Sequence, residues 1–335
     1  MNNKLLFLFS IIAITVFSND LTADNSSDLV TIKEWKVSWE GRPRDPFVAP
    51  SGNVWFCGQA GNYIARLEPS TGQFKKFEVP EGSHPHNLII DSKGFVWYAG
   101  NRNAHIGKLD PKTGKITQYD MPQEIKDPHT LVFDQNGDIW FTAQTSNAIG
   151  HLSTKTGKVN YVKAKTDYAR PYGIKMDAND KPWIVMVGTN KLATVDPVSF
   201  KLMEIELPRQ DARPRRLEIT ENNNIWYVDY AGGFLGQYDP KTKKFSEWKM
   251  PGGDLSFPYG TALDASQRIW IAETGSSPNK LVSFDTTTKK FLNITEIKSE
   301  GSIRHMYFDP KSNSFWFGVD SGFIGRAKIL KSVKK

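Results

Sequence analysis

Arginine and histidine side chains are concentrated at one recurrent place in this chain. Seven groups of four residues hold seven of the 12 arginines and four of the six histidines, but none of the lysines. Guanidinium groups form planar, paired hydrogen bonds with carboxylates and phosphates, and histidine exchanges protons near neutral pH. The combination predicts recognition of an anion, with or without proton transfer. The seven groups are residues 42–45, 84–87, 127–130, 170–173, 213–216, 257–260 and 303–306.

These groups recur because the chain is a repeat. Each begins 13 residues before a tryptophan, and successive tryptophans are 42, 43, 43, 43, 44 and 46 residues apart. Within a repeat, four short segments alternate apolar and polar residues between Gly, Pro, Asn and Asp, which is typical of β-strands. Four strands in a repeat of this length are typical of a propeller blade. The tryptophans are Trp55, Trp97, Trp140, Trp183, Trp226, Trp270 and Trp316.

The sequence therefore predicts an all-β fold, a seven-bladed β-propeller over residues 30–330 with four antiparallel strands per blade. We expect the tryptophans to pack between blades, and the single cysteine, Cys57, to be an inert buried thiol. The last repeat lacks a fourth strand, and residues 31–37 match one. The N-terminal strand is expected to close the last blade, since closure removes free sheet edges.

The first strand of each blade lines the channel of a propeller, so the seven groups should meet at one mouth of that channel. The residues 11 positions before each tryptophan should form a ring of Arg44, His86, His129, Tyr172, Arg215, Tyr259 and His305. The candidate proton-transfer residues are His86, His129 and His305. The candidate ligand-binding residues are Arg44, Arg170, Tyr172, Arg213, Arg215, Tyr259 and Arg304.

Three arginines make the densest cationic cluster in the chain. Successive side chains on a strand face opposite ways, so Arg213 and Arg215 are expected to share the channel face. Arg216 is then expected to point to a neighbouring blade or to Glu218. Repulsion between these charges predicts a bound anion. Alternatively, some of these arginines tie loops together through backbone carbonyls.

Acidic residues should reach the same mouth from the ends of the second strands. Asp229 and Glu273 stand three residues after a tryptophan, Asp320 stands four after, and Asp127 opens one of the groups. They could pair with the arginines, which we favour, or bind a cation. The candidate ligands for Mg²⁺ are Asp127, Asp229 and Glu273.

The N-terminus has the features of an export signal. Lys4 precedes a 13-residue apolar stretch, residues 5–17, which is short for a membrane span. Cleavage is expected after Ser18, or alternatively after Ala23, and residues 19–29 form a polar leader. Residues 1–18 are therefore left out of the predicted fold. We expect a secreted or periplasmic monomer without a membrane span. The net charge of +7 without a basic–aromatic stripe does not indicate nucleic-acid binding.

The wording of the repeat resembles the streptogramin lyase (virginiamycin B lyase) family. It reads P-x-x-(apolar)-D-x-x-G-x-(apolar)-W-F, followed by I-G-x-(apolar)-D-P-x-T-G, over nearly the whole mature chain. The resemblance implies the same propeller and an elimination at an ester that opens cyclic antibiotics. It also implies a histidine as acid or base, with Mg²⁺ held by glutamates.

In the family, two histidines stand at the ring position of neighbouring blades. The glutamates stand two residues before the second histidine and three after the tryptophan of the same blade. Direct register places Tyr259 and His305 at the histidine positions, with Ile303 and Val319 at the glutamate positions. A register rotated around the ring gives His86, Asp127 and His129, with Ala143 in place of the second glutamate.

Three functions stay open at this stage, and each expects a small-molecule or anionic ligand. The first is a carbon–oxygen lyase for an ester or lactone, in which a histidine transfers the proton and arginines hold the substrate or stabilise an enolate-like transition state. The second is a non-catalytic propeller that binds an anion at the same mouth. The third is a metal-dependent lactonase that uses Glu273 and Asp229.

Overall fold

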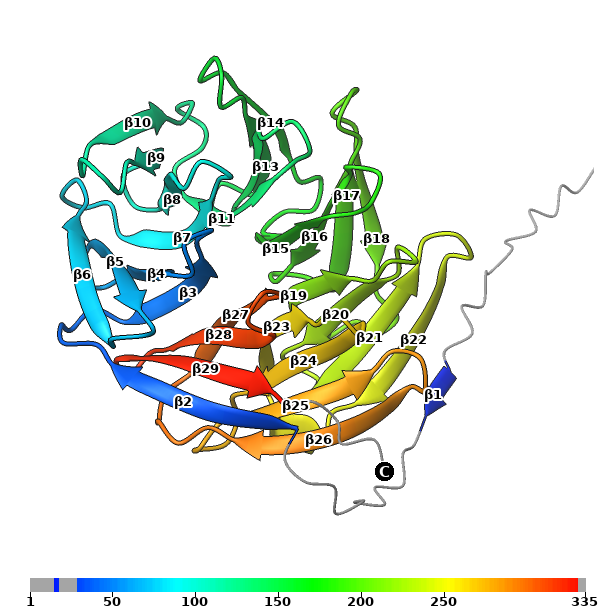
Figure 1. Cartoon of the computed structure of the whole chain (residues 1–335). Coiled ribbons are helices and arrows are strands. Elements are labelled where there is room, and N and C mark those ends of the chain that lie inside the picture. Colours follow the sequence, from blue (N-terminus) through cyan, green and yellow to red (C-terminus); the bar gives the residue numbers. More distant parts are fainter. Residues whose placement is uncertain (1–14, 18–28, 331–335) are drawn as a thin grey trace, which may run out of the picture.

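The computed structural model describes residues 15–17 and 29–330, and it confirms the predicted seven-bladed β-propeller (Figure 1). The innermost strands of successive blades contact one another, and the last of them returns to the first, so the ring is closed. The helical part of the described chain is one short turn, η1 (Gly253–Leu255). Among the described residues, no helix has the length and apolar character needed to cross a membrane.

The first three blades run in order from the innermost to the outermost strand. Blade one consists of β3 (Pro43–Val48), β4 (Val54–Gly58), β5 (Tyr63–Glu68) and β6 (Gln73–Glu78). Blade two consists of β7 (Pro85–Ile90), β8 (Val96–Gly100), β9 (His105–Leu109) and β10 (Ile116–Asp120). Blade three consists of β11 (Pro128–Phe133), β12 (Ile139–Ala143), β13 (Ala148–Leu152) and β14 (Val159–Lys163).

The next three blades repeat this order. Blade four consists of β15 (Pro171–Met176), β16 (Pro182–Met186), β17 (Lys191–Val195) and β18 (Leu202–Glu206). Blade five consists of β19 (Pro214–Ile219), β20 (Ile225–Asp229), β21 (Phe234–Asp239) and β22 (Lys244–Lys249). Blade six consists of β23 (Pro258–Leu263), β24 (Arg268–Glu273), β25 (Lys280–Asp285) and β26 (Lys290–Glu296).

Blade seven joins the two ends of the propeller. Its inner strands are β27 (Ile303–Asp309), β28 (Ser314–Val319) and β29 (Phe323–Ile329), and its outer strand is β2 (Val30–Lys36). Figure 1 shows β2, in blue, lying along β29, in red. The two strands pair antiparallel along their whole length, from Val30 opposite Ile329 to Lys36 opposite Phe323. The predicted closure by the N-terminal strand is thereby confirmed.

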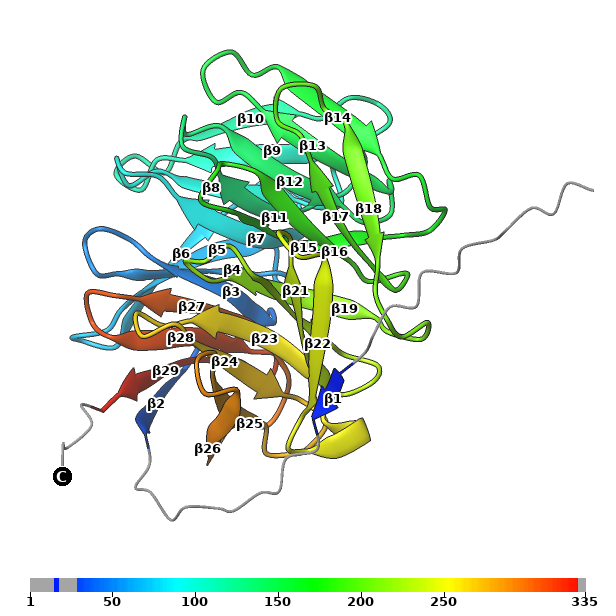
Figure 2. The same cartoon turned by 90° about the vertical axis from the view of Figure 1, so that its right-hand side faces the viewer.

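One strand lies outside the predicted propeller. β1 (Thr15–Phe17) pairs in parallel with the outer strand of blade five, β22 (Figure 2). It belongs to the segment that the sequence assigns to a signal peptide and leaves out of the fold. The rest of that segment, including both predicted cleavage sites, lies outside the described residues.

The repeated tryptophans are core residues, as predicted, and none of the seven is more than 4% exposed. The aspartate six positions earlier holds the indole in place: Asp91 accepts the Trp97 indole N–H at 3.0 Å. Its other oxygen accepts backbone N–H groups of the turn at Lys93 and Phe95. The same aspartate–tryptophan bond recurs at Trp183 and Trp270. This aspartate of the repeat motif therefore connects the turn to the buried tryptophan by hydrogen bonds.

The glycine of the I-G-x motif occupies a position that has no room for a side chain. Gly150 on β13 lies opposite Phe141 on β12, and a Cβ at this glycine would lie 2.1 Å from a Phe141 ring carbon. Gly107 has the same relation to Tyr98 in blade two.

The single cysteine, Cys57, is fully buried, and burial raises the pKa of its thiol well above the ordinary value.

Removal of β2 should open blade seven. Deleting residues 1–37 exposes the edge of β29, so we expect aggregation or a large fall in melting temperature. Deleting residues 1–28 retains β2 and serves as the matched control, with a melting temperature close to that of the full chain. Calorimetry on both truncations makes the comparison. A normal melting transition for the 1–37 deletion would show that β2 does not hold the ring closed.

Candidate functional site

A β-bulge interrupts the innermost strand of every blade near the channel mouth, the end of the channel at which these strands begin. In blade five, Pro214 lies opposite Asp229 and Arg216 lies opposite Val228, so Arg215 has no residue opposite it. An extra residue breaks the alternation of a strand, and consecutive side chains then face the same side. Arg215 and Arg216 both face the channel for this reason. Strict alternation would turn Arg216 toward a neighbouring blade or an acid such as Glu218; the acid it approaches is instead Asp45, at 3.7 Å, and its guanidinium carbon lies 5.1 Å from the Tyr172 ring centre of blade four.

Five side chains from the predicted ring pack in a row at the mouth. The His86 and His129 rings lie 3.7 Å apart, and the His129 and Tyr172 rings lie 4.3 Å apart, measured between centroids. The Tyr172 and Tyr259 hydroxyl groups share a hydrogen bond. The Arg215 guanidinium carbon lies 4.7 Å from the centre of the Tyr259 ring. Five of the seven predicted ring positions therefore converge, whereas Arg44 and His305 lie behind this row.

A second polar layer lies directly behind this ring and is centred on the fully buried Asp45. Its carboxylate accepts a hydrogen bond from Arg44 Nε at 3.1 Å and one from Asn87 Nδ2 at 3.0 Å. Arg216 Nη2 lies 3.7 Å from the same carboxylate. Burial opposes ionisation, but Arg44 and the other cationic neighbours hold the pKa of Asp45 well below its ordinary value. The layer is therefore a charged pair of arginines around one carboxylate.

Arg216 links blades that are far apart in the sequence. Its Nε donates to the Arg304 carbonyl of blade seven at 3.2 Å, and its Nη1 lies 3.4 Å from the Thr130 hydroxyl of blade three. Together with Asp45 of blade one, these contacts place the Arg216 guanidinium inside the channel. Neither Arg216 nor Asp45 was among the predicted ligand-binding residues, although both belong to the seven groups and Asp45 is one of only two acids in them.

His305 departs from the other ring residues. Its side chain lines a cavity behind the ring, and its Nδ1 has no hydrogen-bond partner among the described residues. Burial lowers the pKa of His305 to about 3. The neighbouring Arg304 does reach the mouth, where its guanidinium carbon lies 5.6 Å from the Tyr259 ring centre. Arg304 donates to Asp320 at 2.7 Å, which confirms the predicted pairing of that acid.

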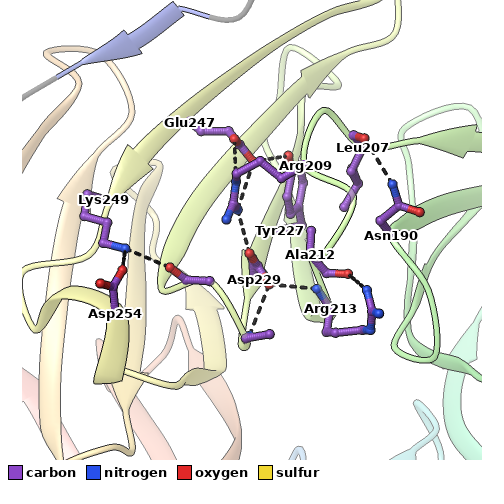
Figure 3. Close-up of polar contacts among 12 residues, drawn as sticks. Asn190, Leu207, Arg209, Ala212, Arg213, Tyr227, Asp229, Glu247, Lys249 and Asp254 are labelled. Atoms are coloured by element: carbon purple, nitrogen blue, oxygen red, sulfur yellow. Dashed lines mark hydrogen bonds and ion pairs between the residues drawn. The ribbon is translucent and has the colours of Figure 1, made fainter.

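Arg213 does not share the channel face with Arg215, contrary to the prediction. Its guanidinium donates to the backbone carbonyls of Ala212 at 2.6 Å and Gln210 at 3.4 Å, so it ties a loop together (Figure 3). Arg170 is exposed at the rim and lines a surface hollow with Tyr168.

The three acids proposed as metal ligands are each used within the scaffold. Asp229 pairs with Arg209 at 2.5 Å and accepts the Arg213 backbone N–H at 2.7 Å (Figure 3). Asp127 accepts the backbone N–H groups of Thr145 and Ser146.

Glu273 shows a different use from the predicted ion pair, because its carboxylate accepts the Gly252 backbone N–H at 2.8 Å. Burial raises the pKa of Glu273. Within residues 29–330, the one grouping with metal-ligand spacing is Asp134, Asp138 and His151 in blade three, and it includes none of the three proposed ligands.

The donor set does not fit the Mg²⁺ site that the family resemblance implies. In direct register both glutamate positions hold fully buried apolar side chains, Ile303 and Val319. In the rotated register the oxygens of Asp127 are engaged by backbone N–H groups, and Ala143 offers no ligand. Magnesium prefers carboxylate oxygens and water.

The ring residues differ in which protonation state they favour. Burial, together with Arg44 and Arg216, lowers the pKa of His86 and His129 well below the ordinary value, so both imidazoles are neutral. Burial alone would raise the pKa of Tyr259. Nearby guanidinium groups outweigh that effect and lower it to about 8; they belong to Arg215, Arg44, Arg216 and Arg304. Tyr259 is thus the ring residue whose charge changes closest to neutral pH.

Comparison with known proteins agrees with this architecture. The sequence profile described as the virginiamycin B lyase family matches residues 25–281. The chain belongs to the virginiamycin B lyase family. A streptogramin B lyase structure is 25% identical, with a TM-score of 0.82, over 91% of this chain and 100% of that one. Virginiamycin B lyase from Staphylococcus aureus is 22% identical, with a TM-score of 0.81, over 90% and 100%. A search of curated proteins found no match.

The same fold also occurs in an extracellular domain. The extracellular domain of a protein described as a hybrid two-component system, from B. thetaiotaomicron, is 15% identical with a TM-score of 0.70. The match covers 91% of this chain and 44% of that one.

The charge state of Tyr259 can be measured directly. We expect one tyrosine of the wild type to ionise with a pKa of about 8 in an ultraviolet absorbance titration. Arg215→Met should move that transition toward the ordinary value of about 10, and Tyr259→Phe should remove it. Because the pKa of the folded state is the lower one, ionisation adds stability as the pH rises from about 8 to about 10. Absence of an early transition in the wild type would refute this assignment.

Proposed function

We propose that this chain is an exported propeller that binds a small carboxylate-bearing molecule at the channel mouth. The observation that carries the proposal is the environment of Arg215, which has no carboxylate partner among the described residues. Its guanidinium carbon lies 3.8 Å from the Tyr230 ring centre and 4.7 Å from that of Tyr259. A guanidinium stacked on aromatic rings keeps its N–H edge free for a planar anion.

The surroundings of Arg215 favour a ligand of negative charge. Arg304 contributes a second guanidinium at Tyr259, although it is already paired with Asp320. Arg215 Nε is buried and has no hydrogen-bond partner among the described residues. A buried donor without a partner is costly, and a carboxylate oxygen would satisfy it. Tyr230 and Phe257, whose rings lie 5.1 Å apart, provide an apolar wall beside it.

Calorimetric titration with citrate tests this site. We expect Arg215→Met to weaken citrate binding by about 1.5–3 kcal/mol, which is the range for a hydrogen bond to a charged group. The melting temperature should change little, because methionine retains the apolar part of the side chain over Tyr230.

Arg213→Met is the matched control, because Arg213 carries the same charge two residues away but binds loop carbonyls. It should leave the citrate affinity within about twofold of wild type. Equal affinities for all three proteins, or equal losses in both variants, would contradict a binding site at Arg215.

A lyase is the second candidate, and one observation favours it. Tyr259 stands at a position where the family resemblance implies a histidine, and its pKa of about 8 makes it a usable base. Its phenolate oxygen would take a proton from a carbon of the substrate. The electron pair of that C–H bond would form a C=C bond, and the carboxylate on the neighbouring carbon would leave. Arg215 and Arg304 would stabilise the negative charge that develops on the carbonyl oxygen.

Incubation with quinupristin separates the two candidates, since a virginiamycin B lyase variant has been crystallised with this compound. Under the lyase hypothesis, mass spectrometry should detect ring opening that persists with a chelator and is lost in Tyr259→Phe. Ring opening that a chelator abolishes would overturn the metal-free scheme. Intact quinupristin after incubation with the wild type would argue against the lyase and leave binding at the mouth as the function.

A further inference from the structure

A cavity of about 400 Å³ occupies the channel on the other side of the ring from the mouth. Among the ring positions, only His305 lines it, so the row from His86 to Arg215 separates it from the mouth. Its lining extends along the inner strands to Pro310, an exposed residue after β27, at the end of the channel opposite the mouth. The volume lies within the range of about 300–1,000 Å³ for small-molecule sites.

The inner end of this cavity, which we call the floor, is polar and incompletely hydrogen-bonded. Arg216 is only 4% exposed, yet its Nη2 has no hydrogen-bond partner among the described residues. His305 Nδ1 is in the same condition. Asn87 and Thr130 also line this end. Buried donors without partners are rare in native structures, and each calls for a ligand or water.

The charge at the floor is positive. Two buried arginines, Arg44 and Arg216, share the single carboxylate of Asp45. Further along the wall, Lys175 and Glu218 neutralise each other at 3.1 Å, and the Lys175 side chain is 39% exposed. An uncompensated cation in a low-dielectric site attracts an anion strongly.

The walls between the floor and the open end are largely apolar. Phe47 and Tyr307 pack with ring centroids 4.3 Å apart, and Ile89, Val132 and Phe308 also line the cavity. A ligand that fits both regions has an anionic head and an apolar body.

From these features we propose that the cavity binds a monocarboxylic acid with an aliphatic or aromatic tail. The carboxylate meets Arg216 and His305, and the tail lies along the wall toward Pro310. This site is separate from the mouth, and the ligand reaches it from the opposite face of the propeller. The proposal does not depend on the function proposed for Arg215.

Octanoate is the probe, titrated by calorimetry into the wild type and five variants. Arg215→Met removes the proposed mouth site and should retain the octanoate binding that belongs to the cavity, since Arg215 does not line it. Arg216→Met should reduce the affinity at least tenfold, because it removes the floor cation.

Glu218→Gln should tighten octanoate binding several-fold. It removes a negative charge from the wall while keeping the shape and the contact with Thr261. A mouth site or a non-specific surface site would not respond in this direction. Unchanged or weaker binding in Glu218→Gln would contradict an anion in the cavity.

A steric variant keeps the test valid if Arg216→Met folds poorly. Val132→Trp fills the cavity from its wall and should abolish octanoate binding with the charges intact. Phe133→Trp is the matched control, because Phe133 is the next residue on β11 and does not line the cavity. It should bind octanoate normally.

The ligand series supplies the last criterion. Affinity should rise about fourfold with each buried methylene from butanoate to octanoate, as expected for transfer of CH₂ into an apolar cavity. Octylammonium, with the same tail and the opposite charge, should bind at least tenfold more weakly. No saturable octanoate binding by the wild type, a flat chain-length series, or equal binding of octylammonium would each overturn the proposal.

Discussion

The centre of this propeller depends on the interactions of one carboxylate, that of Asp45. It is fully buried, accepts hydrogen bonds from Arg44 and Asn87, and lies 3.7 Å from Arg216 across the channel. Its backbone has φ of 49°, the left-handed region that aspartate tolerates better than most residues. Without it, two guanidinium groups would face each other in a medium of low dielectric. With it, side chains from blades one, two and five contact one another in a single layer. Because two arginines share one carboxylate, this layer keeps a net positive charge.

The β-bulge near the start of each inner strand creates this arrangement. It turns two consecutive residues toward the channel. In blades two to six the first of these residues joins the row at the mouth. Asn87, Thr130 and Arg216, each at the next position, lie behind that row. Arg215 stacks on tyrosines at the mouth, whereas Arg216 bonds to Thr130 and the Arg304 carbonyl behind it. The two proposed sites, which a ligand would enter from opposite faces, therefore depend on two consecutive residues of one strand, Arg215 and Arg216.

The fold was predictable because its signals are local. The same signals recur along the chain: the tryptophan, the aspartate that accepts its indole N–H, as at Trp97, and the glycine opposite an aromatic ring, as at Phe141. The positions of the ring residues followed from the same period. The direction of Arg216 and the loop contacts of Arg213 did not, because strict alternation ignores the bulge and no sequence pattern reports it. Arg209, which pairs with Asp229, lies outside the repeated groups and was missed for that reason.

This chain belongs to the virginiamycin B lyase family but differs from the family pattern at the positions of the metal ligands. The chain keeps the propeller and the convergence of ring positions, but apolar Ile303 and Val319 stand where the family pattern implies metal-binding glutamates. A cation has no oxygen ligands there, and the mouth carries arginines instead. Charge stabilisation at the mouth therefore rests on guanidinium groups, which bind anions without a metal. The same groups depress the pKa of Tyr259 to about 8, so the substitution of tyrosine for histidine still leaves an ionisable group near neutral pH. The two proposed functions, binding of a carboxylate and abstraction of a proton beside one, would draw on this same arrangement of charges, which is why both are assigned to one mouth.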